Sequence, residues 1–138
     1  MASEMAIEGG CYCGALRYRV QGEPMFKGQC HCRECQYFAG GGVNHFMGVA
    51  ADALTFTRGA PKRFQRSDLE QPVVRTFCGE CGTQIYSQAP AVPALILKAG
   101  TLDDPSHYGG PSFATFTVDQ QSYHHVPEGC RTFERMPG

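Results

Sequence analysis

The sequence has no excess of charge of either sign and no long hydrophobic run. Its 12 Lys and Arg residues balance 13 Asp and Glu residues, which gives a formal net charge of -1. Such a chain has no overall field to attract nucleic acid or an anionic membrane, so we expect neither as a partner. The longest apolar stretch, 91–97, contains Pro93. It is far shorter than the roughly 20 residues of a transmembrane helix, so we expect no membrane span.

Repeats, low-complexity runs and linkers are also absent, and we expect a single domain over residues 1–138. The first ten residues have neither the basic region nor the apolar region of a secretory signal, so we expect a cytoplasmic protein. In a reducing compartment, cysteines are more typical of metal ligands or catalytic groups than of disulfides. The eight cysteines of this chain therefore become the centre of the functional question.

The pattern of the chain predicts an all-β fold. Residues 15–20 alternate, with Leu16, Tyr18 and Val20 on one face of a half-buried strand. Gly (17) and Pro (9) are spread along the chain and separate further short apolar segments. Residues 32–38 are the one segment expected to form a helical turn, which Gly40–Gly42 would end. We expect stacked or tent-like antiparallel sheets, with further strands at 25–29, 43–49, 54–57, 63–66, 73–77, 84–87, 95–99, 112–118 and 121–125.

Two pairs of cysteines have the spacing of half a zinc site each. Cys78 and Cys81 are three apart and are followed by Gly82, which permits the positive φ of a tight turn. Cys11 and Cys13 are two apart at the expected start of a strand and project to one side of the chain. Together the pairs predict a closed site with four thiolate ligands. The alternative is a disulfide or a pair of free thiols.

A second group of cysteines has a different character. Cys30, Cys32 and Cys35 can hold one face of an ion and leave the fourth tetrahedral position free, as in catalytic zinc sites. That position can take water or an external thiolate, since soft sulfur ligands suit zinc. The alternative is a second closed site completed by His31, His45 or Cys130. His31 lies between two ligands and should point away from the metal, and Cys130 reads as an ordinary thiol.

The order of these motifs resembles the glutathione-dependent formaldehyde-activating enzyme family, also called the centromere protein V family. The segments 100–105 and 132–137 also look like the tail of that family. One departure is that family members often carry a tryptophan near the C-terminus, where this chain has Tyr123. The matching motifs are Cys11-Tyr12-Cys13-Gly14, Cys30-His31-Cys32-Arg33-Glu34-Cys35 and Phe77-Cys78-Gly79-Glu80-Cys81-Gly82-Thr83.

The resemblance implies a β-tent fold of short antiparallel sheets that two zinc ions stabilise. It assigns a structural zinc to Cys11, Cys13, Cys78 and Cys81, and a catalytic zinc to Cys30, Cys32 and Cys35. It also implies a carbon–sulfur lyase that forms S-hydroxymethylglutathione from glutathione and formaldehyde, with a small thiol as partner. The departure at Tyr123 concerns the identity of the substrate.

Three groups of residues are candidates for contacts with such a substrate. Arg33 lies within the cysteine motif and is our candidate for binding a carboxylate of the thiol. The basic residues of 58–66 are a second candidate, although a solvated hairpin explains them as well. The sequence offers no clear general base; His45 is the least unsuitable candidate, with a core or surface histidine as the alternative.

Two other functions remain open on the sequence. One is a non-catalytic zinc-ribbon module that binds a protein, nucleic acid or small thiol. The other is a redox or metal sensor in which Cys30, Cys32 and Cys35 are oxidised reversibly.

Overall fold

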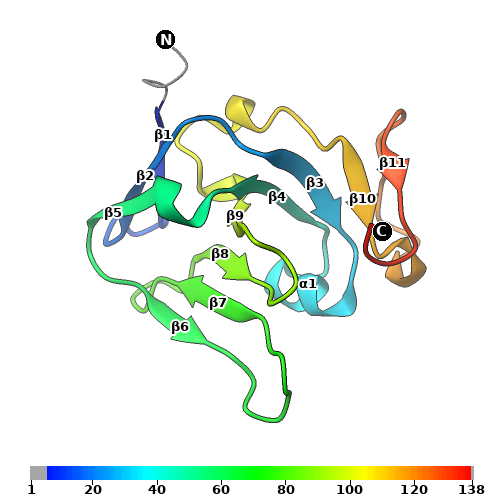
Figure 1. Cartoon of the computed structure of the whole chain (residues 1–138), viewed down its shortest axis with the longest axis horizontal. Coiled ribbons are helices and arrows are strands. Elements are labelled where there is room, and N and C mark those ends of the chain that lie inside the picture. Colours follow the sequence, from blue (N-terminus) through cyan, green and yellow to red (C-terminus); the bar gives the residue numbers. More distant parts are fainter. Residues whose placement is uncertain (1–5, 138) are drawn as a thin grey trace.

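Strand β2 (Arg17–Gln21) follows directly from the alternation in the sequence. Tyr18 and Val20 are 1% exposed, whereas Arg19 on the opposite face is exposed. In this computed structural model, which describes residues 6–137, β2 is the middle strand of a small antiparallel sheet with the order β1-β2-β5. Its neighbours are β1 (Ala6–Gly10) and β5 (Leu54–Arg58), at the left of Figure 1. Residues 1–5, which form half of the segment examined for a secretory signal, lie outside the described residues.

The second sheet has eight strands and the order β11-β10-β3-β4-β9-β8-β7-β6. Strands β3 and β4 form its centre, and β10 and β11 extend it on the right of Figure 1. Its strands are β3 (Phe26–Cys30), β4 (Asn44–Val49), β6 (Lys62–Phe64), β7 (Val74–Phe77), β8 (Gln84–Gln88), β9 (Leu95–Lys98), β10 (Phe113–Thr115) and β11 (Arg131–Thr132).

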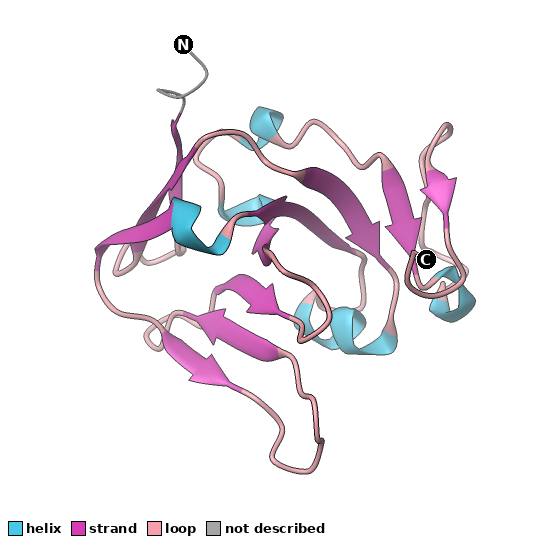
Figure 2. Cartoon of the chain, in the orientation of Figure 1, coloured by secondary structure: helices cyan, strands magenta, loops and turns pink. Residues whose placement is uncertain are grey.

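The all-β prediction is confirmed, and helices are few and short (Figure 2). The longest is α1 (Arg33–Phe38), and no helix within residues 6–137 has the length and hydrophobicity needed to cross a membrane. The end of α1 was predicted correctly, because Gly40 adopts a φ of 68° just after it. The remaining helices are single 3-10 turns: η2 (Ala51–Ala53), η3 (Ala99–Thr101), η4 (Pro105–His107) and η5 (Thr117–Asp119).

The structure differs from the predicted strands in four places. Strand β10 runs parallel to β3 and to β11, so the large sheet is mixed rather than wholly antiparallel. The expected strand 112–118 ends at Thr115 and continues into η5. The expected strand 121–125 is wrong, because the His124 side chain accepts a hydrogen bond from the Gln121 N–H and closes a turn. Strands β1 and β11 were not predicted.

The centre of the large sheet has two apolar faces with different roles. Met47, Val49 and Leu97 point into the main core, which also contains residues of the small sheet such as Tyr18 and Val20. The alternate residues of β3, β4 and β9 face the other way because neighbouring side chains on a strand point to opposite faces. Phe46, Ile96 and Cys30 belong to this second face and pack in a separate cluster. The second face is the one that forms the candidate site.

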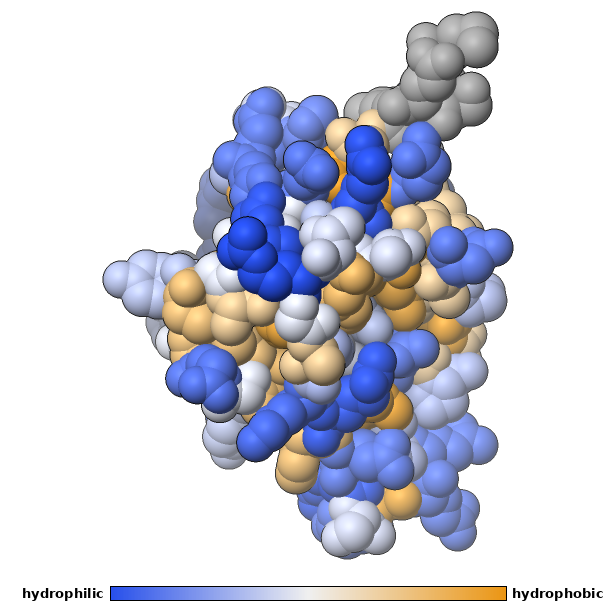
Figure 3. Space-filling view, turned by 90° about the vertical axis from the view of Figure 1, so that its left-hand side faces the viewer, coloured by the Kyte–Doolittle hydropathy of each residue, from blue (hydrophilic) through white to orange (hydrophobic). Residues whose placement is uncertain are grey.

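The outer face of the small sheet is polar. Figure 3 shows the left-hand side of the molecule, where hydrophilic residues predominate and hydrophobic ones form separate patches. The basic residues of 58–66 lie on exposed positions of β5, β6 and the loops beside them. Arg58 donates to the Gly14 carbonyl, and Arg66 pairs with Asp68. These basic residues are thus solvated, and none of them lines the cavity described below.

Candidate metal centres and the adjoining cavity

Four cysteine sulfurs meet between two hairpin loops. Cys11 and Cys13 lie in the loop between β1 and β2, and Cys78 and Cys81 lie in the loop between β7 and β8. All four sulfurs lie within 4.8 Å of one another; we call them the four-sulfur cluster. Those of Cys11 and Cys13 are 3.7 Å apart, and those of Cys13 and Cys78 are 3.8 Å apart. A tetrahedral ion with Zn–S bonds of about 2.3 Å places its sulfurs about 3.8 Å apart, so the cluster fits zinc.

Local backbone geometry holds these sulfurs in place. Gly14 and Gly82, the residues after each pair, have φ values of 84° and 80°, as the spacing predicted. The backbone N–H of Leu16 donates to the Cys11 sulfur at 3.2 Å. The Thr83 hydroxyl lies 3.1 Å from the Cys81 sulfur and lowers the pKa of that thiol to about 5. Hydrogen-bond donors of this kind favour the thiolate form, which is the metal-binding form.

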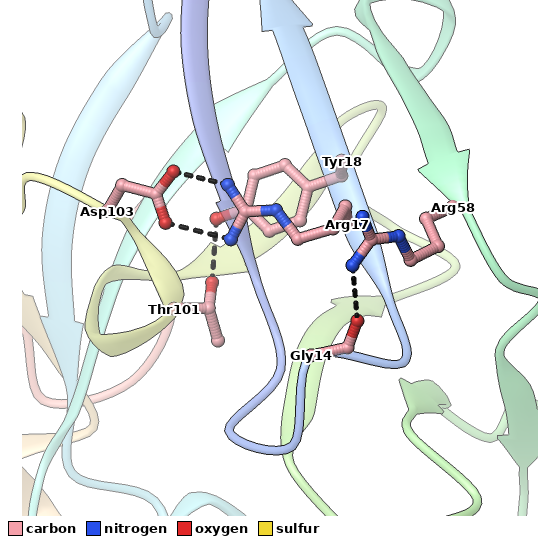
Figure 4. A network of polar contacts seen from close by, with 6 residues as sticks. All are labelled: Gly14, Arg17, Tyr18, Arg58, Thr101 and Asp103. Atoms are coloured by element: carbon pink, nitrogen blue, oxygen red, sulfur yellow. Dashed lines mark hydrogen bonds and ion pairs between the residues drawn. The ribbon is translucent and has the colours of Figure 1, made fainter.

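Polar contacts of β2 support the loop that carries Cys11 and Cys13 (Figure 4). Arg17 forms a two-pronged ion pair with Asp103, and the Tyr18 hydroxyl lies 2.7 Å from the Thr101 hydroxyl. Both partners come from the segment 100–105 that resembles the family tail. That segment therefore fixes β2, which leads directly out of the loop that carries Cys11 and Cys13. Asp103 is thus engaged by Arg17, and the neighbouring Asp104 accepts a hydrogen bond from the Ser106 N–H in a local turn.

The remaining sulfurs form a three-sulfur cluster at the end of β3. Cys30 is the last residue of β3, Cys32 is the N-cap of α1, and Cys35 lies in the first turn of α1. The Cys35 N–H donates to the Cys32 sulfur at 3.3 Å, and the three sulfurs lie within 4.8 Å of one another. Hydrogen bonds from Cys32 and Cys35 lower the pKa of Cys30 to about 3, and the contact with Cys30 raises the pKa of Cys35. Contacts with the neighbouring cysteines thus favour the thiolate form of Cys30.

The two clusters differ in the number of ligands that the chain supplies. The eight cysteines are all free thiols, which excludes the disulfide alternative. Within residues 6–137, no His, Cys, Asp or Glu ligand atom completes the three-sulfur cluster. Cys130 is elsewhere and contacts the Pro111 carbonyl, and His45 contacts the Tyr108 hydroxyl at 3.3 Å. The three-sulfur cluster can hold a metal ion on three sides and leave a position for a further ligand.

His31 points away from the sulfurs, as its position predicted. Its side chain is completely buried; its Nε2 lies 2.8 Å from the Gln29 side chain, and its Nδ1 lies 3.1 Å from Nδ1 of His124. Burial lowers the pKa of His31. His124 in turn contacts the Gly41 carbonyl at 2.9 Å. These contacts connect the residues between β3 and α1 to the segment that follows β10. No spacing in the sequence indicated this role of His124.

A cavity of about 980 Å³ adjoins the three-sulfur cluster. Cys30, Cys32 and Cys35 form part of its wall, and Arg33 also lines it, as expected for a residue inside the cysteine motif. The Arg33 guanidinium contacts Gln36 and stacks on Tyr37. His45 faces the opposite side of the sheet and does not line the cavity, so its proposed role as a general base is wrong. Tyr123, at the position of the missing tryptophan, does not line it either and packs against His124.

Two polar residues beside the sulfurs were missed from the sequence. Asn44 pairs with Cys30 in the register of β3 and β4, is 3% exposed and lines the cavity. Lys98 donates to its Oδ1 at 2.8 Å. Burial lowers the pKa of Lys98, and attraction to the nearby cysteines opposes that effect. Each residue is the lone polar member of an apolar strand face, and only the strand register reveals that they meet.

An ion pair also lines the cavity. Arg75, with a side chain that is 6% exposed, pairs with Glu34 at 3.0 Å and lies over the Phe38 ring. Glu34 and Arg75 both line the cavity, but each neutralises the other. Arg33, inside the sulfur motif, has no carboxylate partner among the described residues.

Comparisons with known proteins agree with this geometry. A Halomonas elongata protein named "Putative glutathione-dependent formaldehyde-activating enzyme" is 33% identical over 98 residues, which are 67% of this chain and 62% of that protein. The match thus spans less than two thirds of the relative. A crystal structure of a Rhodobacter sphaeroides protein has the same fold, with a TM-score of 0.58 and 22% identity over 75% of this chain and 96% of that one. The sequence model of one family matches residues 6–119, and the chain therefore belongs to the glutathione-dependent formaldehyde-activating enzyme family.

Proposed function

We propose that the protein is a zinc-dependent carbon–sulfur lyase acting on thiol adducts, similar to S-(hydroxymethyl)glutathione synthase. The observation that carries the proposal is the three-sulfur cluster in the wall of a large cavity. A purely structural zinc site is closed by four protein ligands, as the four-sulfur cluster would be. The chain would thus form one zinc site with four protein ligands and one with three. A thiol can bind at the fourth coordination position of the second site.

The assignment of roles follows from the number of sulfurs. Cys11, Cys13, Cys78 and Cys81 would hold a structural zinc that joins the two hairpin loops. Cys30, Cys32 and Cys35 would hold a second zinc. When bound there, the ion supplies a position at which an external thiol is held as its thiolate at neutral pH.

Asn44 and Lys98 would act on the other reactant. A lysine ammonium can only donate, so the atom of Asn44 that faces Lys98 is its carbonyl oxygen. The amide nitrogen of Asn44 then points elsewhere, and no hydrogen bond within the described residues engages it. It can donate to an aldehyde oxygen beside Cys30.

The reaction that this arrangement supports is addition of a thiol to an aldehyde, and its reversal. The thiolate sulfur attacks the carbonyl carbon, a C–S bond forms, and the π electron pair moves to the oxygen, which takes a proton from water. Asn44 would stabilise the oxygen as negative charge develops. Lys98 would position Asn44, and its charge would offset the net charge of -1 of three thiolates with a divalent ion. Arg33 would bind a carboxylate of the thiol.

The proposal is tested by zinc content and by the zinc-edge absorption spectrum with and without glutathione. We expect two zinc ions per chain and an average sulfur count per zinc that rises when glutathione is added. The Cys32→Ala variant should keep one zinc and lose the response. A single zinc per chain with no response to glutathione would instead favour the non-catalytic module.

The role of Asn44 has its own test. Asn44→Asp keeps the size and a partner for Lys98 but replaces the amide donor with an acceptor. We expect the enzymatic rate above the spontaneous thiol–formaldehyde reaction to fall about 100-fold, as for loss of an oxyanion donor, with little change in glutathione affinity. Gln65→Glu is the matched control, since it makes the same chemical change at an exposed position. A loss of affinity with an unchanged rate would contradict the role.

A further inference from the structure

The wall of the cavity is far more apolar than glutathione and formaldehyde require. The rings of Phe26, Phe46 and Phe113 lie with their centroids 6.0–6.2 Å apart and pack in one cluster with Cys30 and Cys35. The three rings therefore lie next to the cysteines of the three-sulfur cluster. A polar tripeptide thiol gains little from such a surface, and formaldehyde is a single carbon and oxygen.

Two glycines show how the aromatic wall is built. Gly48 pairs with Phe26, and a Cβ at Gly48 would lie 2.1 Å from the Phe26 ring. A Cβ at Gly28 would lie 2.6 Å from the Phe113 ring and 2.9 Å from the Phe46 ring. The rings therefore occupy the space that side chains at these two positions would take. This arrangement keeps the rings against the sheet, and the space above them remains available.

Two other parts of the cavity wall are apolar as well. The loop between β8 and β9 contributes Ala89, Pro90, Ala91 and Val92. The segment 131–137, which we call the C-terminal segment, contributes Phe133 and Met136, among others. It is held by hydrogen bonds such as those from the N–H groups of Phe116 and Thr117 to the carbonyls of Arg135 and Phe133, beside β10 in Figure 1.

The C-terminal segment follows the part of the chain that the family model matches. The family match ends at residue 119, whereas this wall begins at Arg131. A volume of about 980 Å³ is at the upper end of the range for pockets that hold drug-sized ligands.

We infer that the substrate is a thiol adduct whose carbonyl-derived carbon carries an apolar chain or an aromatic ring. This inference rests on the proposed function and names the substrate class of the same site. The reacting atoms would lie at the three-sulfur cluster, and the apolar group would lie between the aromatic wall and the C-terminal segment. The same C–S bond forms as with formaldehyde, so no additional reactant is required.

The test is a binding series that needs no turnover. The zinc-loaded full chain is titrated by calorimetry with S-methyl-, S-propyl- and S-hexylglutathione. Burial of each added methylene in an apolar site should tighten binding about fourfold. An affinity that does not change along the series would overturn the inference.

Two methionine variants locate the effect in the cavity. Met136 is 51% exposed and lines the cavity, and Met25 is 56% exposed and does not. Met136→Glu should weaken S-hexylglutathione by about fivefold and S-methylglutathione much less, because it puts a charge beside the apolar chain. Met25→Glu should change neither. Equal effects of the two variants would also overturn the inference.

The outcome separates this inference from the proposed function. If glutathione raises the sulfur count at zinc but affinity is flat along the series, the lyase proposal stands and the substrate class is wrong. If affinity rises along the series and Met136→Glu reduces it, while glutathione leaves the zinc spectrum unchanged, the apolar site stands and the thiol chemistry is wrong.

Discussion

The contact between Tyr18 and Thr101 yields a prediction whose size can be worked out from the structure. The Thr101 hydroxyl donates to the Lys98 carbonyl at 2.8 Å, because a carbonyl can only accept. The Tyr18 hydroxyl must therefore be the donor in its 2.7 Å contact with Thr101. Burial raises the pKa of Tyr18 to about 12, so the hydroxyl keeps its proton at neutral pH. The two residues form a directed chain of hydrogen bonds that ends on the carbonyl of Lys98, the last residue of β9.

The direction of the chain makes the two single substitutions unequal. Tyr18→Phe removes the first donor and leaves the Thr101 hydroxyl bonded to Lys98, so we expect a cost of about 1 kcal/mol in the free energy of unfolding. Thr101→Val breaks both bonds and leaves the hydroxyl of Tyr18, which is 1% exposed, without a partner. That should cost about 2–3 kcal/mol. The double variant should cost less than the sum, because Phe has no hydroxyl to leave unpaired.

Urea denaturation followed by circular dichroism measures these differences. Free zinc must be the same for every variant, since ligand binding to the folded state adds to the apparent stability. In thermal unfolding, each 1 kcal/mol should lower the midpoint by about 4 °C for a chain of this size. A Thr101→Val variant as stable as Tyr18→Phe would refute the assigned direction of the bonds.

Three further predictions concern the metal sites, the aromatic wall and an ion pair. Cys78→Ala should give insoluble protein because it removes a ligand from the closed site, whereas Cys32→Ala should stay folded and lose activity. Soluble yield and circular dichroism measure the folding of both variants. If both variants unfold alike, the division into a structural and a catalytic site is wrong. Gly48→Ala should cost about 1–3 kcal/mol in unfolding free energy and weaken S-hexylglutathione binding, because the Phe26 ring must move; unchanged values in both measurements would argue against the wall. The hydrogen bonds from Arg17 lower the pKa of the Asp103 carboxyl in the folded protein. The ion pair therefore stabilises the fold fully above the unfolded pKa of about 3.9. This contribution is lost as the pH falls through the lower pKa that Asp103 has in the folded state. Because the pair is largely exposed, Asp103→Asn should cost less than about 1 kcal/mol at neutral pH, and high salt should shrink the difference in urea midpoints; a difference that persists in high salt would point to another cause.

Much of the fold could be predicted because its signals are local. The alternation in β2 and the glycines after α1 act over a few residues, and both predicted correctly. The parallel position of β10 could not be predicted, because pairing with β3 depends on a partner more than eighty residues away in sequence. The error at 121–125 has the same origin. A histidine that closes a turn and reaches a second buried histidine leaves no mark on the local pattern.

The candidate site divides in the same way. The spacing of the cysteines and the glycines after them determined two sets of sulfurs and the turns that present them, because a thiolate pair two or three residues apart is fixed by its own backbone. Only the tertiary structure decided that Asn44 and Lys98 stand beside the sulfurs and that His45 does not. The face on which a strand residue lies relative to a distant site is set by sheet register, and one step in register reverses it. The apolar wall from the C-terminal segment likewise depends on where β11 joins the sheet, since its residues line the same cavity as the cysteines only after the chain has folded.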